Sequence, residues 1–291
     1  MVEQITEKMF TLENANVRAV ISNAGAELRS LKDLRNGREQ MWERDPAVWK
    51  QSAPWLFPIV GKLREDIYRV GDRSYGLTIH GFASRKRFET VEYTQNMLHL
   101  RLTADEETRA CYPWDFELHI AYELEDHGLK ITARVVDLSG DTMYFSLGAH
   151  PGFACDTGDR LIFECPERLT VHRLTEDTHL LLPAKQDEEE TRELTLAPEM
   201  FDSEAMILEA PKSRSVMLER RDGTCVRYRF PQVPWLGLWS RRGSSLRYIC
   251  IEPWFGVDDP IDADGALEKK CAIRSLRPGE EFQCEYGIEL C

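Results

Sequence analysis

The stretch Phe116-Glu-Leu-His-Ile-Ala-Tyr-Glu-Leu124 decides the fold, because apolar residues alternate in it with mostly polar ones. The run 129–135 repeats this alternation directly afterwards, and Asp126-His127-Gly128 lies between the two runs. A period of two places the apolar side chains on one face of an extended strand. The sequence therefore predicts an antiparallel hairpin here, with Gly128 supplying the turn.

Similar alternation recurs along the rest of the chain, whereas helical periodicity is scarce. We expect further strands at 17–21, 88–93, 97–103, 215–219, 226–230, 246–252 and 282–288, and a turn or two of helix at 104–110 and 197–201. Strands do not alternate regularly with helices, which argues against a doubly wound or TIM-type sheet. This pattern predicts an all-β protein, a large antiparallel β-sandwich with few short helices. Residues 1–291 contain no internal repeat, linker or composition break, so we expect a single domain.

Charge and composition narrow the function classes. The chain has 37 lysines and arginines against 50 acidic residues, a formal net charge of −13. Such a surface repels nucleic-acid phosphates and anionic membranes, so neither is an expected partner. No run approaches the ~20 apolar residues that span a bilayer, and residues 1–12 do not resemble a signal peptide. We expect a cytoplasmic protein whose eight cysteines are reduced and mostly buried.

Three segments place a titratable residue beside glycine or proline at an expected strand end. They are Gly61-Lys62-Leu63-Arg64 with the following Ile79–Ala83, then Gly148–Phe153, and finally Ile249–Gly256. Such positions project side chains from a rigid sheet, although a histidine there can equally be a turn residue bonded to the backbone. Glu252 follows an apolar run, and a partly buried carboxylate must be paired or used. Trp254, two residues later, could be core or a platform for the face of a sugar.

These segments resemble the motifs of the aldose 1-epimerase (galactose mutarotase-like) family, in particular its shorter LacX-type branch. The matching stretches are Phe57–Leu63, His80–Ala83, Ala149–Phe153 and Ile251–Trp254, with Leu236–Ser240 as a weaker fifth. They occur in the family's order, and the similarity extends from about Asn14 to Leu290. The resemblance implies the galactose mutarotase-like supersandwich, with the sugar site in an open cleft on its concave side.

The resemblance also implies a reaction and roles for individual residues. The expected activity is the interconversion of the α and β anomers of an aldose or an aldose phosphate. His150 matches the general acid that protonates the ring oxygen, Glu252 the general base at the anomeric hydroxyl, and His80 a histidine that hydrogen-bonds the substrate. A carboxylate and an imidazolium with a pKa near the usual ~6.5 suit this chemistry close to neutral pH. No metal and no cofactor are expected.

The residues that would bind the sugar hydroxyls are less clearly matched to the family's motifs than the acid and the base are. The family's arginine corresponds to Arg64 or Lys62, and its aspartate to Glu204, with Asp202 as the rival position. Trp254 is a further candidate for substrate binding. Five cations flank the His80 segment and could hold a phosphate, or could simply be solvated loop charges: Lys62, Arg64, Arg85, Lys86 and Arg87. The partner is therefore a sugar or a sugar phosphate, and the oligomeric state cannot be read from the sequence.

Three other classes of protein compete with an epimerase as interpretations of these residues. A metal enzyme is disfavoured because the chain has no His-x-His pair and its candidate ligands are widely spaced. A glycoside hydrolase would pair Glu252 with Glu204 or Asp202 and would leave both histidines without a task. The alternative from another class is a non-catalytic carbohydrate-binding or sugar-sensing protein on the same fold. The presence of both a candidate acid and a candidate base argues against this alternative, because a protein that only binds sugar needs neither.

Overall fold

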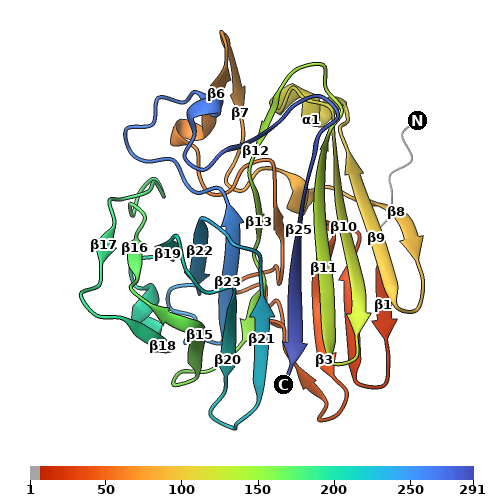
Figure 1. Cartoon of the computed structure of the whole chain (residues 1–291), viewed down its shortest axis with the longest axis vertical. Coiled ribbons are helices and arrows are strands. Elements are labelled where there is room, and N and C mark those ends of the chain that lie inside the picture. The colour runs from red at the N-terminus through yellow and green to blue at the C-terminus, as the bar shows by residue number, and fades with distance from the viewer. Residues whose placement is uncertain (1–6) are drawn as a thin grey trace.

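The computed structural model describes residues 7–291 and is built mainly from antiparallel strands (Figure 1). Its largest sheet has nine strands, in the spatial order β18 (Thr191–Thr195), β15 (Arg160–Glu167), β20 (Ser215–Glu219), β21 (Cys225–Arg229), β25 (Glu281–Leu290), β11 (Gly128–Asp137), β10 (Phe116–Glu125), β9 (Met97–Thr103) and β8 (Glu89–Tyr93). This architecture confirms the predicted all-β fold.

A second large sheet has eight strands and carries the candidate site. Its order is β17 (Lys185–Gln186), β16 (Thr170–His172), β19 (Met206–Glu209), β22 (Trp235–Trp239), β23 (Tyr248–Phe255), β13 (Leu147–Ala149) and β5 (Trp55–Leu56), while β14 (Gly152–Ala154) pairs with β23 off this path. A four-stranded sheet contains β1 (Met9–Glu13), β2 (Val17–Ser22), β3 (Glu27–Asp33) and β4 (Arg38–Glu39).

The remaining elements are short. Two ribbons pair β6 (Ile67–Val70) with β7 (Arg73–Gly76) and β12 (Met143–Phe145) with β24 (Arg274–Leu276). Four 3₁₀ turns are η1 (Arg64–Asp66), η2 (Ala83–Arg85), η3 (Pro198–Phe201) and η4 (Leu267–Lys269). The helix α1 (Glu106–Cys111) begins after Asp105, whose carboxylate accepts the Thr108 N–H as an N-cap. Both expected short helical segments are therefore present.

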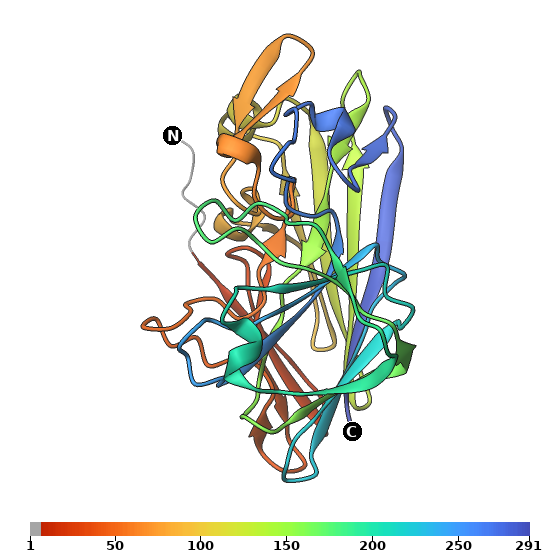
Figure 2. The same ribbon diagram turned by 90° about the vertical axis from the view of Figure 1, so that its left-hand side faces the viewer.

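The main core lies between the nine-stranded sheet and the other sheets. Figure 2 shows the red strands β1–β3 on one side of the molecule and the strands of the nine-stranded sheet on the other. One hydrophobic cluster contains side chains from both sides, among them Ile21 of β2, Leu118 of β10 and Ile288 of β25. The alternation seen in the sequence thus directs every second side chain into this shared core.

The predicted hairpin is confirmed, but the role predicted for its glycine is wrong. β10 pairs with β11 from Phe116↔Asp137 to Glu125↔Gly128, so Gly128 is the first residue of a strand and not part of the turn. A Cβ at this position would lie 2.1 Å from the Ile288 carbonyl oxygen of β25. Glycine is required here because the backbone of the neighbouring strand passes so close.

β23 positions the site because both of its faces are covered. Ile249, Ile251 and Phe255 point into the main core, whereas Tyr248, Cys250 and Trp254 belong to two smaller clusters on the opposite face. The apolar run seen in the sequence is therefore a strand buried on both sides. The strand also continues through Pro253 to Phe255, so Glu252 lies within it and not at its end as expected.

The eight cysteines are all free, as predicted, but fewer are buried than expected. Cys155, Cys250 and Cys284 are buried, whereas Cys271 and Cys291 are exposed, and the other three are intermediate. The described part of the chain contains no helix that is both long and apolar enough to cross a bilayer.

Candidate active site

Strand register brings His150 next to Glu252. β23 pairs with β13 through Gly148↔Trp254 and with β14 through Gly152↔Cys250. His150 and Pro151 form the short connection between those two strands, and the Pro151 carbonyl accepts the Ile251 N–H at 3.1 Å. Because the connection is this short, the His150 side chain is held directly beside the middle of β23.

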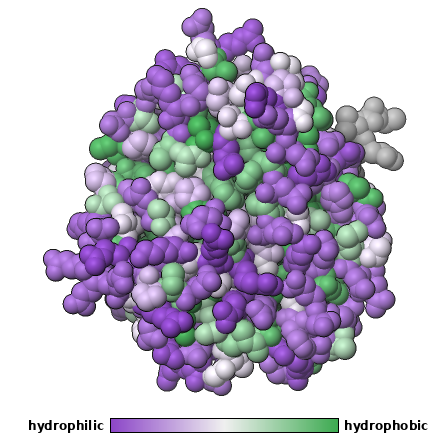
Figure 3. Space-filling view, in the orientation of Figure 1, coloured by the Kyte–Doolittle hydropathy of each residue, from purple (hydrophilic) through white to green (hydrophobic). Residues whose placement is uncertain are grey.

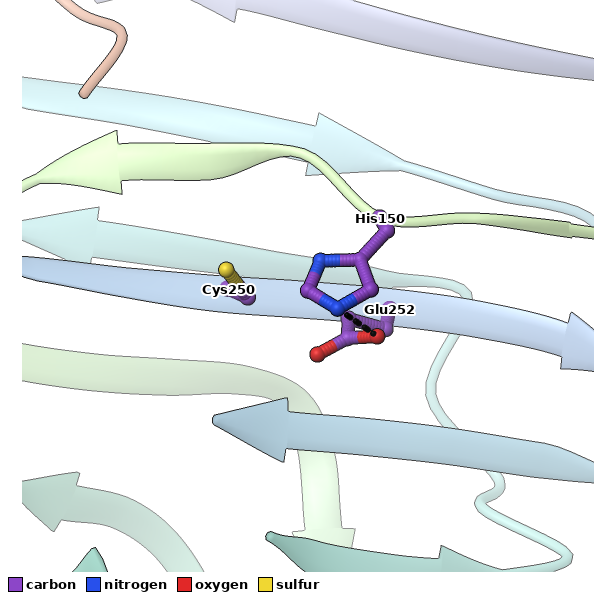
Figure 4. A group of neighbouring side chains, drawn as sticks. All are labelled: His150, Cys250 and Glu252. Atoms are coloured by element: carbon purple, nitrogen blue, oxygen red, sulfur yellow. Dashed lines mark ion pairs between the residues drawn. The ribbon is translucent and has the colours of Figure 1, made fainter. Parts of the chain in front are cut away.

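The two side chains form a close pair on the face of the eight-stranded sheet that lies away from the main core. His150 Nε2 is 3.0 Å from Glu252 Oε2, and the side chains are only 10% and 2% exposed. Figure 4 shows the imidazole above the carboxylate, with the Cys250 thiol on the same side of β23. Ligand atoms of these three residues lie within 4.8 Å of one another.

Burial shifts the proton affinity of both partners. Desolvation, together with the charge of Asp258, raises the pKa of Glu252 well above its usual value. Desolvation and the neighbouring His80 lower the pKa of His150 well below its usual value. These directions differ from the near-normal imidazolium expected from the sequence, because both groups have lost contact with water. Within the pair, Glu252 is a strong base when ionised, and His150 is a strong acid when protonated.

His80 faces this pair as a neutral imidazole. Its ring centre lies 5.8 Å from that of His150, edge to face. Its Nδ1 accepts the Gly61 backbone N–H at 3.1 Å, which leaves the proton of the neutral ring on Nε2. Burial lowers the pKa of His80 to about 4, and nearby Arg85 adds to the effect. The residue has φ +62°, in the left-handed region, which is an uncommon conformation for a residue other than glycine.

The three residues line a cavity of about 300 Å³ with an aromatic wall. The Trp49 ring centre lies 5.1 Å from that of His150, and the Trp239 ring centre lies 5.6 Å from it. Trp254, a predicted substrate-binding residue, also lines the cavity. Flat apolar rings around a few convergent polar groups are typical of small-molecule sites.

Glycines on both neighbouring strands make room for the Trp254 indole. A Cβ at Gly148 of β13 would lie 2.7 Å from Trp254 Cδ1, and one at Gly237 of β22 would lie 2.7 Å from Trp254 Cζ2. Gly237 is also the register partner of Glu252. Neither neighbour could carry a side chain on this face without displacing the indole.

Two predicted binding residues do not reach the cavity. The Lys62 ammonium pairs with Asp66 at 2.5 Å, and the Arg64 guanidinium donates to the Ala263 carbonyl at 3.1 Å. Lys62 instead contributes its backbone N–H, which donates to buried Asp258 at 2.6 Å. Neither side chain is among those that line the cavity.

The remaining candidates are the two alternative carboxylates for binding sugar hydroxyls and the cations near His80. Glu204 lines this cavity and also the neighbouring one, whereas its rival Asp202 lines only the neighbouring one. Of the five cations around the His80 segment, Arg85 alone lines the cavity, and Lys86 instead pairs with Asp105 and Glu107.

Sequence reasoning missed several residues of this cavity, among them Trp49 and Asp258. Trp49 comes from a segment without a recognisable motif, so nothing in the sequence pointed to it. Asp258 follows the Ile249–Gly256 segment by two residues, and its proximity to that segment was an available signal.

Comparison with known proteins agrees with this architecture. The family model described as aldose 1-epimerase matches residues 8–285, and the chain belongs to this family. It is 31% identical to the chromosomal LacX protein of Lactococcus lactis subsp. lactis, over 96% of this chain and 98% of that protein.

Solved structures with the same fold include two from lactobacilli. A galactose mutarotase related enzyme from Lactobacillus acidophilus is 32% identical, with a TM-score of 0.92 over 98% of this chain and 97% of that one. A galactose mutarotase-like protein from Lactobacillus casei ATCC 334 is 26% identical, with a TM-score of 0.91 over 98% of this chain and 100% of that one.

Proposed function

We propose that the protein is an aldose 1-epimerase that opens and recloses the hemiacetal ring of an aldose. The observation that carries this proposal is the buried His150–Glu252 pair, 3.0 Å apart, in a cavity with an aromatic wall. Family membership supports an isomerase of this kind.

Ring opening removes a proton from the anomeric hydroxyl O1 and delivers one to the ring oxygen O5. Glu252 takes the O1 proton while His150 gives its proton to O5, so that the C1–O5 bond breaks and an open-chain aldehyde forms. The pair gains one proton and loses one, so its charge is unchanged. Rotation about C1–C2 followed by the reverse transfers closes the ring as the other anomer.

The pKa shifts strengthen each group once it carries the required charge, and they also make that charged state less populated near neutral pH. Raising the pKa of Glu252 makes its carboxylate a stronger base, and lowering that of His150 makes its imidazolium a stronger acid. Each positioned proton transfer typically contributes about 10²–10⁴-fold to the rate. His80, neutral with its proton on Nε2, can donate a hydrogen bond to a sugar oxygen and does not compete for the proton.

The substrate class is narrowed by the groups that line the cavity. The tryptophans suit the apolar face of a pyranose, and the Glu204 carboxylate can accept hydrogen bonds from sugar hydroxyls. Among residues 7–291, the Arg85 guanidinium donates only to neutral oxygens, those of Thr78 and Gly81. It is therefore the cation available to a phosphate if the substrate is an aldose phosphate.

The test is mutarotation of freshly dissolved α-anomers, followed by polarimetry for glucose and galactose and by NMR exchange for their 6-phosphates. Glu252→Gln should keep the shape of the site and lose about 10²-fold or more of the acceleration. Unchanged activity in this variant would remove Glu252 as the base. If no sugar is turned over although sugars bind, the cavity belongs to a carbohydrate-binding or sugar-sensing protein.

A further inference from the structure

A second cavity lies where two strands of the nine-stranded sheet part. β11 pairs with β25 from Glu281 to Glu289, whereas β21 pairs with it only from Gly287 to Leu290. In Figure 1, β21 accordingly ends partway along β25. The space beside the rest of β25 is a cavity of about 810 Å³, and none of its lining residues lines the cavity of His150 and Glu252.

The lining of this cavity is cationic in a strongly acidic protein. It includes four basic side chains, Lys130, Arg214, Arg229 and Arg274, against two acidic ones, Glu125 and Glu285. Arg229 pairs with Glu125 at 3.0 Å, and Lys130 lies 3.4 Å from Glu285, so both acids are already matched. Arg214 and Arg274 are left as excess positive charge inside a concave surface, where the field of like charges is focused.

Arg274 is the distinctive member of this set. Its guanidinium carbon lies 4.1 Å from the ring centre of Phe282 and 5.2 Å from that of Phe255. Within residues 7–291 its N–H groups have neither a carboxylate partner nor a hydrogen bond, although the chain has 13 more acidic than basic residues. The two rings hold the side chain in place and leave its donors free.

Apolar surface borders these charges. Phe230, Pro231 and Phe282 line the same cavity. The space-filling view of this face shows hydrophobic residues in its upper central part, surrounded by hydrophilic ones (Figure 3). A ligand with a charged end and a flat or apolar body would meet both kinds of surface.

From this arrangement we propose a second, non-catalytic binding site for a small phosphate ester. Its phosphate takes the free donors of Arg274, with Arg214 as the other unmatched cation of the cavity, and its organic part lies against Pro231. A planar guanidinium matches two phosphate oxygens at once, which explains why an unpaired arginine is suited to this position. The site is independent of whether the other cavity turns over a sugar.

The experiment is calorimetric titration of the full-length protein with inorganic phosphate, ribose 5-phosphate and AMP. We expect both esters to bind more tightly than inorganic phosphate, and the stronger of the two shows whether a sugar or a base contacts the apolar wall. Arg274→Gln should weaken binding about tenfold or more, the usual loss for a charge-assisted pair. Arg277→Gln is the matched control, because Arg277 is 80% exposed and pairs with Glu280.

The variant Arg85→Gln distinguishes binding of the esters at this site from binding in the sugar cavity. If affinity for the esters falls in Arg85→Gln and not in Arg274→Gln, the anion binds beside His80 and the proposal is wrong. It is also wrong if the wild type binds none of the three probes. If Arg274→Gln fails to fold, Arg274→Lys and Arg214→Gln test the same proposal. We expect both variants to bind the esters more weakly than the wild type does. The titrations can be repeated in Glu252→Gln, where binding should persist even without turnover.

Discussion

Asp258 sets the electrostatic surroundings of Glu252, the proposed catalytic base. Its carboxylate is buried, accepts the Lys62 N–H, and raises the pKa of Glu252 by its charge. Burial also raises the pKa of Asp258 itself to about 6, from an unfolded value of 3.8. The folded state therefore holds this proton more tightly than the unfolded chain does. The stability that results is complete below pH 3.8 and is lost as the pH rises through 6.

Asp258→Asn should remove this pH dependence while keeping an oxygen for the Lys62 N–H. Between pH 4 and 7 the wild type should lose roughly 3 kcal/mol of unfolding free energy that the variant retains. Urea denaturation at several pH values measures the difference, with Asp262→Asn, an exposed position in the same loop, as the control. Parallel curves for wild type and Asp258→Asn would show that Asp258 does not titrate in this window.

The same substitution should change catalysis in a predictable direction. Without the negative charge of Asp258, the pKa of Glu252 falls, so its carboxylate forms at lower pH and is a weaker base. We expect the acid limb of the mutarotation profile to move to lower pH, together with a smaller maximal rate. A limb that stays in place would mean that a group other than Glu252 controls it.

At the level of elements, the room that Gly237 leaves for Trp254 is a requirement of the site. In Gly237→Ala the new Cβ would lie 2.7 Å from Trp254 Cζ2 and 3.2 Å from Glu252 Cβ. Displacement of the indole should cost about 1–3 kcal/mol of stability and should lower mutarotation. Thermal unfolding and tryptophan fluorescence measure both effects.

Gly140→Ala provides the matched control for this substitution. Nothing lies within 4 Å of a Cβ at Gly140, and its backbone is not in the left-handed region. Equal behaviour of the two alanine variants would show that Trp254 adjusts without loss.

The elements themselves could largely be predicted from the sequence, because the alternation of β10, β11 and β25 records which face each side chain takes. The motif residues His80, His150, Glu252 and Trp254 also come together as predicted. The sequence did not predict the directions in which long, flexible side chains point. The Lys62 ammonium pairs with Asp66, close by in the sequence, and the Arg64 guanidinium bonds the Ala263 carbonyl from a distant part of the chain, and no motif specifies either partner.

For the whole molecule, we expect one cooperative unfolding transition. The main hydrophobic cluster runs from Phe10 of β1 to Leu290 of β25 and joins the sheets. Because no subset of strands has a separate core of comparable size among residues 7–291, the sheets should unfold together. Calorimetric and van't Hoff enthalpies should agree, and two resolved transitions would divide the chain into domains.

The central place of β25 has a consequence for how the protein is made. β25 lies between β11 and β21 in the nine-stranded sheet, yet it is synthesised after both of them. Until it emerges from the ribosome, both strands present open edges that can pair with other chains. Nascent chains should therefore depend on chaperones until β25 has been synthesised, and losing these ten residues should cause aggregation even though the proposed catalytic residues all lie upstream.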